Sequence, residues 1–198
     1  MRTGVALRQK GMSRITVQTH VTLDGVIESP PEALFPYMSD EGRQATLELA
    51  LSSDALLLGR VTWQQLAPAW REQTGAMAER FNAMPKYVVT STLSSADEWS
   101  NSKLVTYGEV AALREQLDLL SYGCGALAHD LLRDRLLDEL HLNMTPVVAG
   151  RGRRLFDEPS GLLAFDLTNS RTYPTGAVRL VLRPPGPGAG RLARPAVR

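Results

Sequence analysis

Short apolar runs alternate with helical patterns as far as residue 137, and only strand patterns follow. Strands are expected at 15–21, 55–58, 86–91, 103–106 and 119–122, with helices at 40–53, from 61, at 75–83, 109–117 and 126–137. Pro68 is expected to end or kink the helix that begins at 61, and 29–38 to form a loop. Long strands are expected at 139–149, 163–173 and 177–183. This order predicts one α/β domain with a mixed, mostly parallel sheet, helices on both faces and an antiparallel C-terminal edge.

The ends of the chain differ from its middle. Residues 1–12 and 184–198 carry six cations and no acid, and the second segment is rich in Pro and Gly. We expect both to be disordered, flanking a domain over 13–183. Without these cations the middle has a net charge of about −5, which argues against nucleic-acid binding. No apolar run approaches the ~20 residues of a membrane span. A single cysteine, Cys124, fits a reducing compartment, so we expect a cytoplasmic protein.

The first candidate site follows the strand at 55–58, where Gly59, Arg60, Val61 and Thr62 come at a helix start. The first turn of a helix has free backbone N–H groups that suit a phosphate. Arg60 adds a permanent positive charge and Thr62 a hydroxyl donor. The alternative is an ordinary strand–helix junction with a surface arginine.

A second turn of the same kind contains Gly123, Cys124, Gly125, Ala126 and Leu127. Two glycines let the backbone approach a ligand closely, as in pyrophosphate-binding turns, although the full dinucleotide-binding pattern is absent. A helix start can also activate a cysteine, but no base lies nearby in the sequence. We therefore expect Cys124 to be a small turn residue.

Three hydroxyls, those of Thr90, Ser91 and Thr92, follow the strand that begins at Lys86. Open α/β sheets bind ligands beyond the carboxyl ends of their strands, so these hydroxyls are candidates for binding a phosphate. A capped turn would use the same residue types.

Together these segments resemble the dihydrofolate reductase-like superfamily, and within it the reductase domain found at the C-terminus of bifunctional riboflavin-biosynthesis proteins. The matching pieces follow one another in the family's order: Thr22–Ile27, Leu58–Trp63, Lys86–Ser91, Gly123–Leu127, Leu137–Leu140, Pro146–Gly152 and Leu155–Phe156. The resemblance covers essentially residues 13–183.

The resemblance implies a three-layer, NADPH-dependent reductase that forms homodimers. Segments like Gly59–Thr62 contact cofactor phosphates, hydroxyls like Ser91 and Thr92 reach the adenosine 2′-phosphate region, and segments like Gly123–Leu127 wrap the pyrophosphate. The loop that contains Asp24 would lie beside the nicotinamide and the substrate. From the residues alone, Asp24 is a candidate for orienting the substrate, and the alternative is a plain Asp-Gly turn.

The substrate is less constrained than the cofactor. Riboflavin-pathway reductases usually carry a lysine where this chain has Val26, and the catalytic helix acid of folate reductases has only approximate counterparts in Asp40 and Glu41. Both acids also suit a helix N-terminus. We expect hydride transfer to a small pyrimidine- or pterin-like heterocycle. The alternatives are a true dihydrofolate reductase and a non-catalytic NADP-binding protein.

Other polar residues are given structural roles. The histidines lack metal-ligand spacing, so no metal site is expected. His141 is expected on a strand face, and Asp138 and Glu139 at a loop or a dimer contact.

Overall fold

The computed structural model of the 198-residue chain describes residues 13–28, 31–156 and 163–185. The predicted disorder of 1–12 and of most of the 184–198 tail therefore lies outside the described residues.

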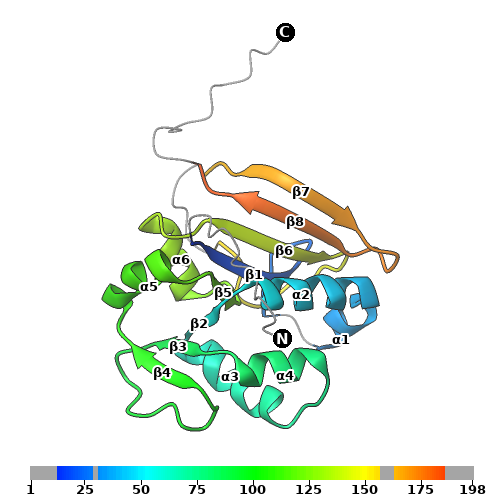
Figure 1. The fold of residues 1–198 in the computed structure, drawn as a ribbon. Helices are drawn as coiled ribbons and strands as arrows, with labels where there is room; N and C mark the ends of the chain where they lie inside the picture. The colour runs from blue at the N-terminus through cyan, green and yellow to red at the C-terminus, as the bar shows by residue number, and fades with distance from the viewer. Residues whose placement is uncertain (1–12, 29–30, 157–162, 186–198) are drawn as a thin grey trace, which may run out of the picture.

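Strands and helices are interspersed as far as α6, with β4 following β3 directly, as Figure 1 shows. The strands are β1 (Ile15–Thr22), β2 (Ala55–Gly59), β3 (Lys86–Val89), β4 (Ser102–Val105), β5 (Leu119–Tyr122), β6 (Glu139–Thr145), β7 (Asp166–Thr172) and β8 (Val178–Arg183). The α-helices are α1 (Pro31–Leu34), α2 (Asp40–Ser52), α3 (Arg60–Arg71), α4 (Ala76–Ala83), α5 (Val110–Gln116) and α6 (Ala126–Arg133). Two short 3₁₀ turns cover Phe35–Tyr37 and Tyr107–Glu109.

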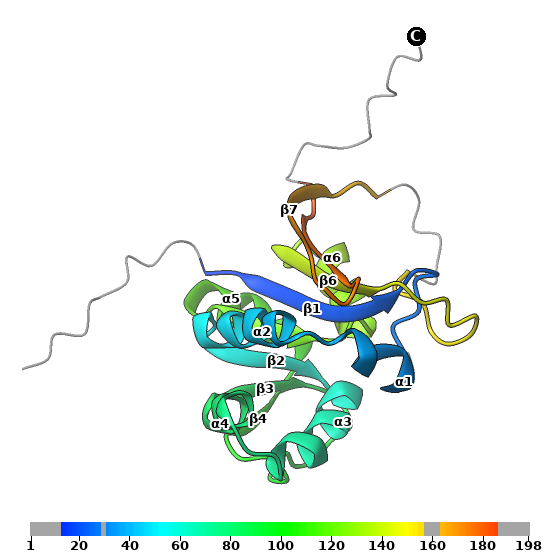
Figure 2. The same cartoon turned by 90° about the vertical axis from the view of Figure 1, so that its right-hand side faces the viewer.

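In the described part of the chain, eight strands form one sheet in the order β4-β3-β2-β5-β1-β6-β8-β7. The strands from β4 to β6 pair in parallel, whereas β8 pairs antiparallel with both β6 and β7. The predicted mixed sheet with an antiparallel C-terminal edge is confirmed. Figure 2 shows that β7 lies at the end of the sheet far from α3 and α4.

Helices cover both faces of the sheet and bury two separate apolar cores. On one face, Val110 of α5 and Leu131 of α6 pack over β1, β2, β5 and β6. On the other face, Ala50 of α2, Trp63 of α3 and Phe81 of α4 pack over β2, β3 and β5. This is the three-layer α/β fold that the resemblance implies.

Helix α3 extends from Arg60 to Arg71 with Pro68 inside it, so Pro68 does not end the helix, and a kink, the other expected outcome, stays a prediction. A proline inside a helix removes one hydrogen bond and crowds the preceding turn, at about 3 kcal/mol. Trp63 and Ala67 of the same helix are buried in the second core. Burial of this face offsets the cost of the proline.

Several predicted boundaries are too long, and one predicted loop is partly helical. The strand expected at 139–149 ends at Thr145, because Pro146 has no N–H to continue the ladder. The helix expected at 126–137 ends at Arg133, and Arg135 then takes a left-handed conformation with φ of 58°. Between 31 and 37, where a loop was expected, α1 and a 3₁₀ turn form, and Pro31 supplies a preset helical φ at the first position.

No helix in the described residues is long and apolar enough to cross a membrane. Nor do those residues contain a group of three or more His, Cys, Asp or Glu side chains that could hold a metal ion.

Candidate cofactor site

The three candidate phosphate-binding segments follow three neighbouring parallel strands at one edge of the sheet. Gly59 ends β2, Thr90 follows β3, and Gly123 follows β5. After β2 the chain turns into α3, on the face of the second core, and after β5 it turns into α6, on the opposite face. A crevice opens where neighbouring connections leave on opposite faces, and open α/β sheets bind ligands there.

The first turn presents its helix start without a side-chain cap. Gly59 is the N-cap of α3 and makes no side-chain hydrogen bond to the helix. The first backbone N–H groups of α3 therefore have no partner within the helix. Arg60 is exposed, and its Nη1 donates to Oε1 of Gln64 at 3.2 Å. Val61 is also exposed.

The second turn repeats this arrangement and touches the first. Gly123 has φ of +75°, a conformation that strongly favours glycine, and its N–H donates to the carbonyl of Gln18 at 2.9 Å. Gly125 is the N-cap of α6, again without a side-chain cap. A Cβ on Gly123 would lie 3.5 Å from Oγ1 of Thr62, and one on Gly59 would lie 3.6 Å from Cβ of Leu127. The two glycine turns are thus adjacent.

The third segment is a capped turn, as its alternative interpretation predicts. Oγ1 of Thr90 accepts the backbone N–H groups of Thr92 and Leu93 at 3.1 and 3.2 Å. The side chains of Ser91 and Thr92 are exposed. Their turn adjoins the first glycine turn, because Val89 pairs in register with Gly59. A role in binding phosphate stays a prediction for all three hydroxyls.

Cys124 lies between the two glycines, and its thiol is buried. Burial raises the pKa of this thiol to about 12, and the nearby charge of Arg153 offsets only part of that rise. The thiol is therefore protonated at neutral pH, which fits a small turn residue and not a nucleophile. Ala126, the first residue of α6, is exposed.

Asp24 ties two loops together. Its carboxylate accepts from Thr22 Oγ1 at 2.6 Å and from the backbone N–H groups of Ala149 and Gly150 at 3.0 and 2.9 Å. These bonds, first of all the one from Thr22, lower the pKa of Asp24 to about 2. The group is therefore ionised at neutral pH and cannot act there as a proton donor. Its described hydrogen bonds lead to loop 146–150 and not to the glycine turns, so its role in orienting a substrate stays a prediction.

Arg153 is a candidate that the sequence patterns did not reveal. Its guanidinium lies 3.6 Å from the position that a Cβ on Gly125 would occupy, beside the amino end of α6. Nη2 forms an ion pair with Oε1 of Glu28 at 2.9 Å. A cation beside the positive end of a helix dipole favours an anion between them. The one sequence signal near Arg153 is the pair of glycines at 150 and 152, which match the family's pattern but do not by themselves predict a binding residue.

The two glycine turns and the neighbouring arginines can together bind a phosphate group. Two uncapped helix starts bring backbone N–H groups to the carboxyl ends of β2 and β5, where Arg60 begins α3 and the Arg153 guanidinium lies beside Gly125.

Comparisons with known proteins agree with the fold. Residues 13–179 match the model of the RibD C-terminal domain family. The uncharacterized protein YyaP of Bacillus subtilis is 28% identical over an alignment of 179 residues that covers 85% of this chain and 93% of that protein.

Solved structures resemble this chain at lower identity. One is the structure of the "putative riboflavin biosynthesis protein" of Shewanella sp. PV-4. It superposes with a TM-score of 0.70 at 18% identity, over 87% of this chain and 99% of that one. A pyrimidine reductase-like protein of Corynebacterium diphtheriae gives 0.60 at 10% identity, over 88% and 93%. A diaminohydroxyphosphoribosylaminopyrimidine deaminase/5-amino-6-(5-phosphoribosylamino)uracil reductase of Thermotoga maritima gives 0.61 at 14% identity, over 87% of this chain and 57% of that longer one.

The family model spans most of the chain, and the family is the reductase part of an enzyme. That supports oxidoreductase chemistry of the pyrimidine-reductase type in general terms. The chain belongs to the RibD C-terminal domain family.

Proposed function

We propose that this protein is an NADPH-dependent reductase that transfers a hydride to a small pyrimidine- or pterin-like heterocycle. The observation that carries the proposal is the contact between the two glycine turns, Gly59–Thr62 and Gly123–Leu127, at the carboxyl ends of the neighbouring strands β2 and β5. Family membership supports the reductase class, and this contact supports the cofactor.

The residues present fit the phosphates of this cofactor. The pyrophosphate would lie against the amino ends of α3 and α6, where neither Gly59 nor Gly125 has a side chain to obstruct it. Arg153 would pair with the pyrophosphate in exchange for Glu28. Arg60, Ser91 and Thr92 would bind the 2′-phosphate, since all three are exposed beside the first turn.

When bound, NADPH supplies the hydride, and the protein supplies position and exclusion of water. Asp24 would act by holding its own loop to 146–150, which fixes the wall beside the substrate. Because its carboxylate is ionised, a proton needed by the product would come from another group or from water.

We further propose a cytoplasmic homodimer. The single cysteine supports a reducing compartment. All seven residues of the edge strand β7 are exposed, and an open edge of this length is usually paired or covered. Sedimentation of the full chain would test the association, and a monomer at micromolar concentration would refute it.

The cofactor assignment is tested by comparing how NADPH and NADH raise the melting temperature of the full chain. A ligand that binds only the folded state stabilises it in proportion to its affinity. We expect a larger rise with NADPH, because the 2′-phosphate gains charged contacts. Equal rises with both nucleotides, or no rise with either, would refute the assignment.

The roles of the two arginines can be separated by substitution. Arg60→Ala should weaken NADPH more than NADH, by about 1–3 kcal/mol, the value of a charged hydrogen bond. Arg153→Ala should weaken both nucleotides alike, because both contain pyrophosphate. Arg71→Ala, at the other end of α3, is the control. An unchanged affinity ratio in Arg60→Ala would place the 2′-phosphate elsewhere.

Turnover distinguishes the alternatives. Oxidation of NADPH should accompany reduction of a pyrimidine or pterin substrate from a panel. Turnover with dihydrofolate alone would identify a true dihydrofolate reductase. Nucleotide binding without turnover of any substrate would favour a non-catalytic NADP-binding protein.

A further inference from the structure

Arg179 of β8 is nearly buried and held in a fixed position, with 8% of its surface exposed. Its Nη2 donates to Nδ1 of His141 at 2.8 Å, and Nε2 of His141 lies 3.1 Å from Oε2 of Glu139. Because Nδ1 accepts, Nε2 carries the proton and donates to Glu139. The other N–H groups of Arg179 have no protein hydrogen-bond partner among the described residues. One side of the guanidinium is therefore anchored, and the other is available.

Two further polar groups near Arg179 are buried without a partner. Asn143 pairs in register with Arg179 across β6 and β8, so the two side chains share a face of the sheet, and Nδ2 of Asn143 makes no hydrogen bond. The hydroxyl of Tyr173 is likewise unpartnered, and this residue is 5% exposed. A buried polar group left without a partner destabilises the folded state. Both atoms can donate a hydrogen bond, so they call for an acceptor.

A groove of about 410 Å³ opens at this place, between α2 and the β7–β8 hairpin. Its lining includes Arg179, Arg171, Tyr173, Asn169, Ser52 and Glu48. Arg171 pairs with Arg179 across the hairpin, and its guanidinium lies 5.4 Å from the ring centre of Tyr173. The volume is within the range of small-molecule sites.

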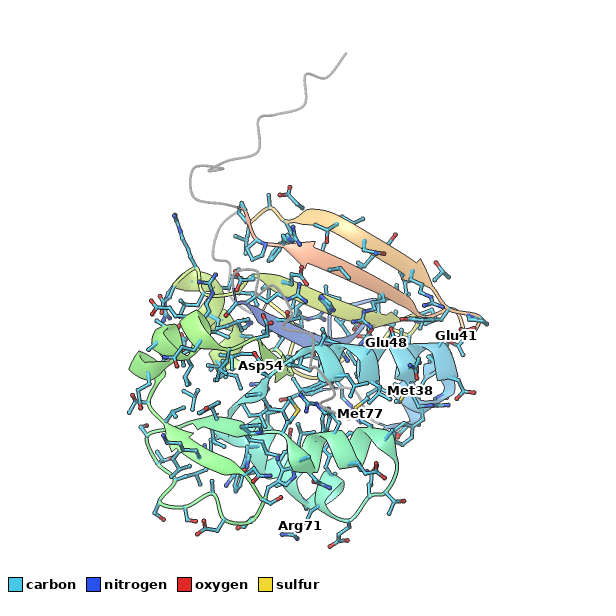
Figure 3. All side chains as sticks on the ribbon, in the orientation of Figure 1. Met38, Glu41, Glu48, Asp54, Arg71 and Met77 are labelled. Atoms are coloured by element: carbon cyan, nitrogen blue, oxygen red, sulfur yellow. The ribbon has the colours of Figure 1, made fainter. Side chains whose placement is uncertain are left out.

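The charges around the groove favour one compact anionic group. The sheet wall carries Arg179 and Arg171, whereas Glu48 stands on the α2 wall. Arg171 also lines an adjoining groove whose acids, Asp40, Glu41 and Glu48, all belong to α2. Figure 3 shows Glu48 and Glu41 on the side of α2 toward the hairpin. A polyanion would meet these carboxylates, but a single anionic group on the sheet wall would not.

We propose that the groove between α2 and the β7–β8 hairpin binds a small molecule through one carboxylate or phosphate monoester. Arg179 and Arg171 provide the charge, and the unpartnered Tyr173 hydroxyl, which also lines the groove, donates a further hydrogen bond. No residue that lines the groove belongs to the candidate cofactor site, so this proposal is independent of the reductase activity.

The test uses the full chain, titrated with inorganic phosphate or with acetate at constant ionic strength and followed by backbone amide NMR. We expect saturable shifts at β8 and over residues 45–52 of α2 with at least one anion, and the two titrations tell which source is preferred. Tyr173→Phe should weaken binding several-fold without lowering the melting temperature, because it removes only an unpartnered hydroxyl. Arg171→Gln should weaken it at least tenfold.

Arg43→Gln is the matched control, because it removes the same charge from an exposed residue near the start of α2 that does not line the groove. Equal weakening by Arg43→Gln would show non-specific salt binding and overturn the proposal. So would an absence of saturable shifts. Shifts that NADPH abolishes would assign the anion to the cofactor site instead. A dimer that Arg171→Gln dissociates, with no anion bound, would show that a second copy fills the groove.

Discussion

The two halves of the sheet are stabilised by different means. From β4 to β5, helices bury apolar side chains on the sheet, and residues such as Leu57 and Leu58 alternate between the two cores without any exposure. In the other half, which consists of β1, β6, β8 and β7, the face toward α2 is polar, and Gln18, Glu139 and His141 are buried there. One half depends on non-directional packing, and the other on hydrogen bonds between specific partners.

This difference separates the two candidate sites. In the apolar half a rigid core supports two glycine turns, and in the proposed cofactor site their backbone N–H groups would bind the ligand. In the polar half the strands themselves carry charged groups, and a groove remains beside α2. Parallel strands with both faces covered favour sites at their ends, whereas a hairpin with an open face can hold one along its length.

Leucine truncation gives the largest expected contrast between the halves. Leu58→Ala should lower the free energy of unfolding by about 2–5 kcal/mol, because it opens a cavity in the second core. Leu167→Ala on β7, where 58% of the side chain is exposed, should change it by less than about 0.5 kcal/mol. Chemical denaturation measures both. Similar losses would mean that β7 is buried in solution, as in an extensive dimer.

Loss of the Glu139 carboxylate should have the next largest effect, and it should depend on pH. The hydrogen bond from His141 is the main cause that holds the pKa of Glu139 at about 2, below its ordinary value of 4.5, and bonding to Arg183 and the charge of Arg14 add to it. A lowered folded pKa means that the stabilisation is complete above 4.5 and is lost as the pH falls toward 2. Glu139→Gln should therefore cost about 1–3 kcal/mol at neutral pH and flatten the loss in acid.

Unfolding measured from neutral pH to pH 3 tests this expectation, with Glu79→Gln on α4 as the control. Glu79 is an exposed acid in the apolar half. An acid-induced loss of stability that is the same in the wild type and in Glu139→Gln would show that this carboxylate does not couple stability to pH.

The fold was predictable because its signals are local. Leu56–Leu58 form an apolar run that ends in glycine, and such a run identifies a buried strand and the turn after it. The same locality made Gly59 and Gly123 visible as candidates. At Pro68 the local signal allowed an end to the helix, but the helix continues, because burial of Trp63 in the second core outweighs the local cost.

The missed residues depend on contacts between distant parts of the chain. The backbone N–H of Ile27 donates to the Arg153 carbonyl at 2.9 Å. This bond holds loop 150–154 against the segment that follows β1, and it brings Arg153 to the amino end of α6. Glu139 was expected at a loop or a dimer contact, but antiparallel pairing of β6 with β8 brings Arg183 to it. His141 is on a strand face as predicted, yet its partner Arg179 lies 38 positions away in sequence.

The smallest expected effect lies at the boundary between the halves, at Tyr122. This residue pairs in register with Gln18, packs edge-on against Phe81 at 5.3 Å between ring centres, and buries a hydroxyl that has no partner. Burial raises the pKa of this phenol well above its ordinary value of 10.0. Tyr122→Phe keeps the apolar contact and removes the unsatisfied group, so the unfolding free energy should stay the same or rise by up to about 1 kcal/mol.

Tyr107→Phe is the control of opposite sign. The Tyr107 hydroxyl donates to Asp134 at 2.8 Å, so its removal should lower the unfolding free energy by about 1 kcal/mol. Paired denaturation curves decide: a clear loss of stability in Tyr122→Phe would mean that a buried water or polar neighbour satisfies the hydroxyl, and that the polar layer extends as far as β5.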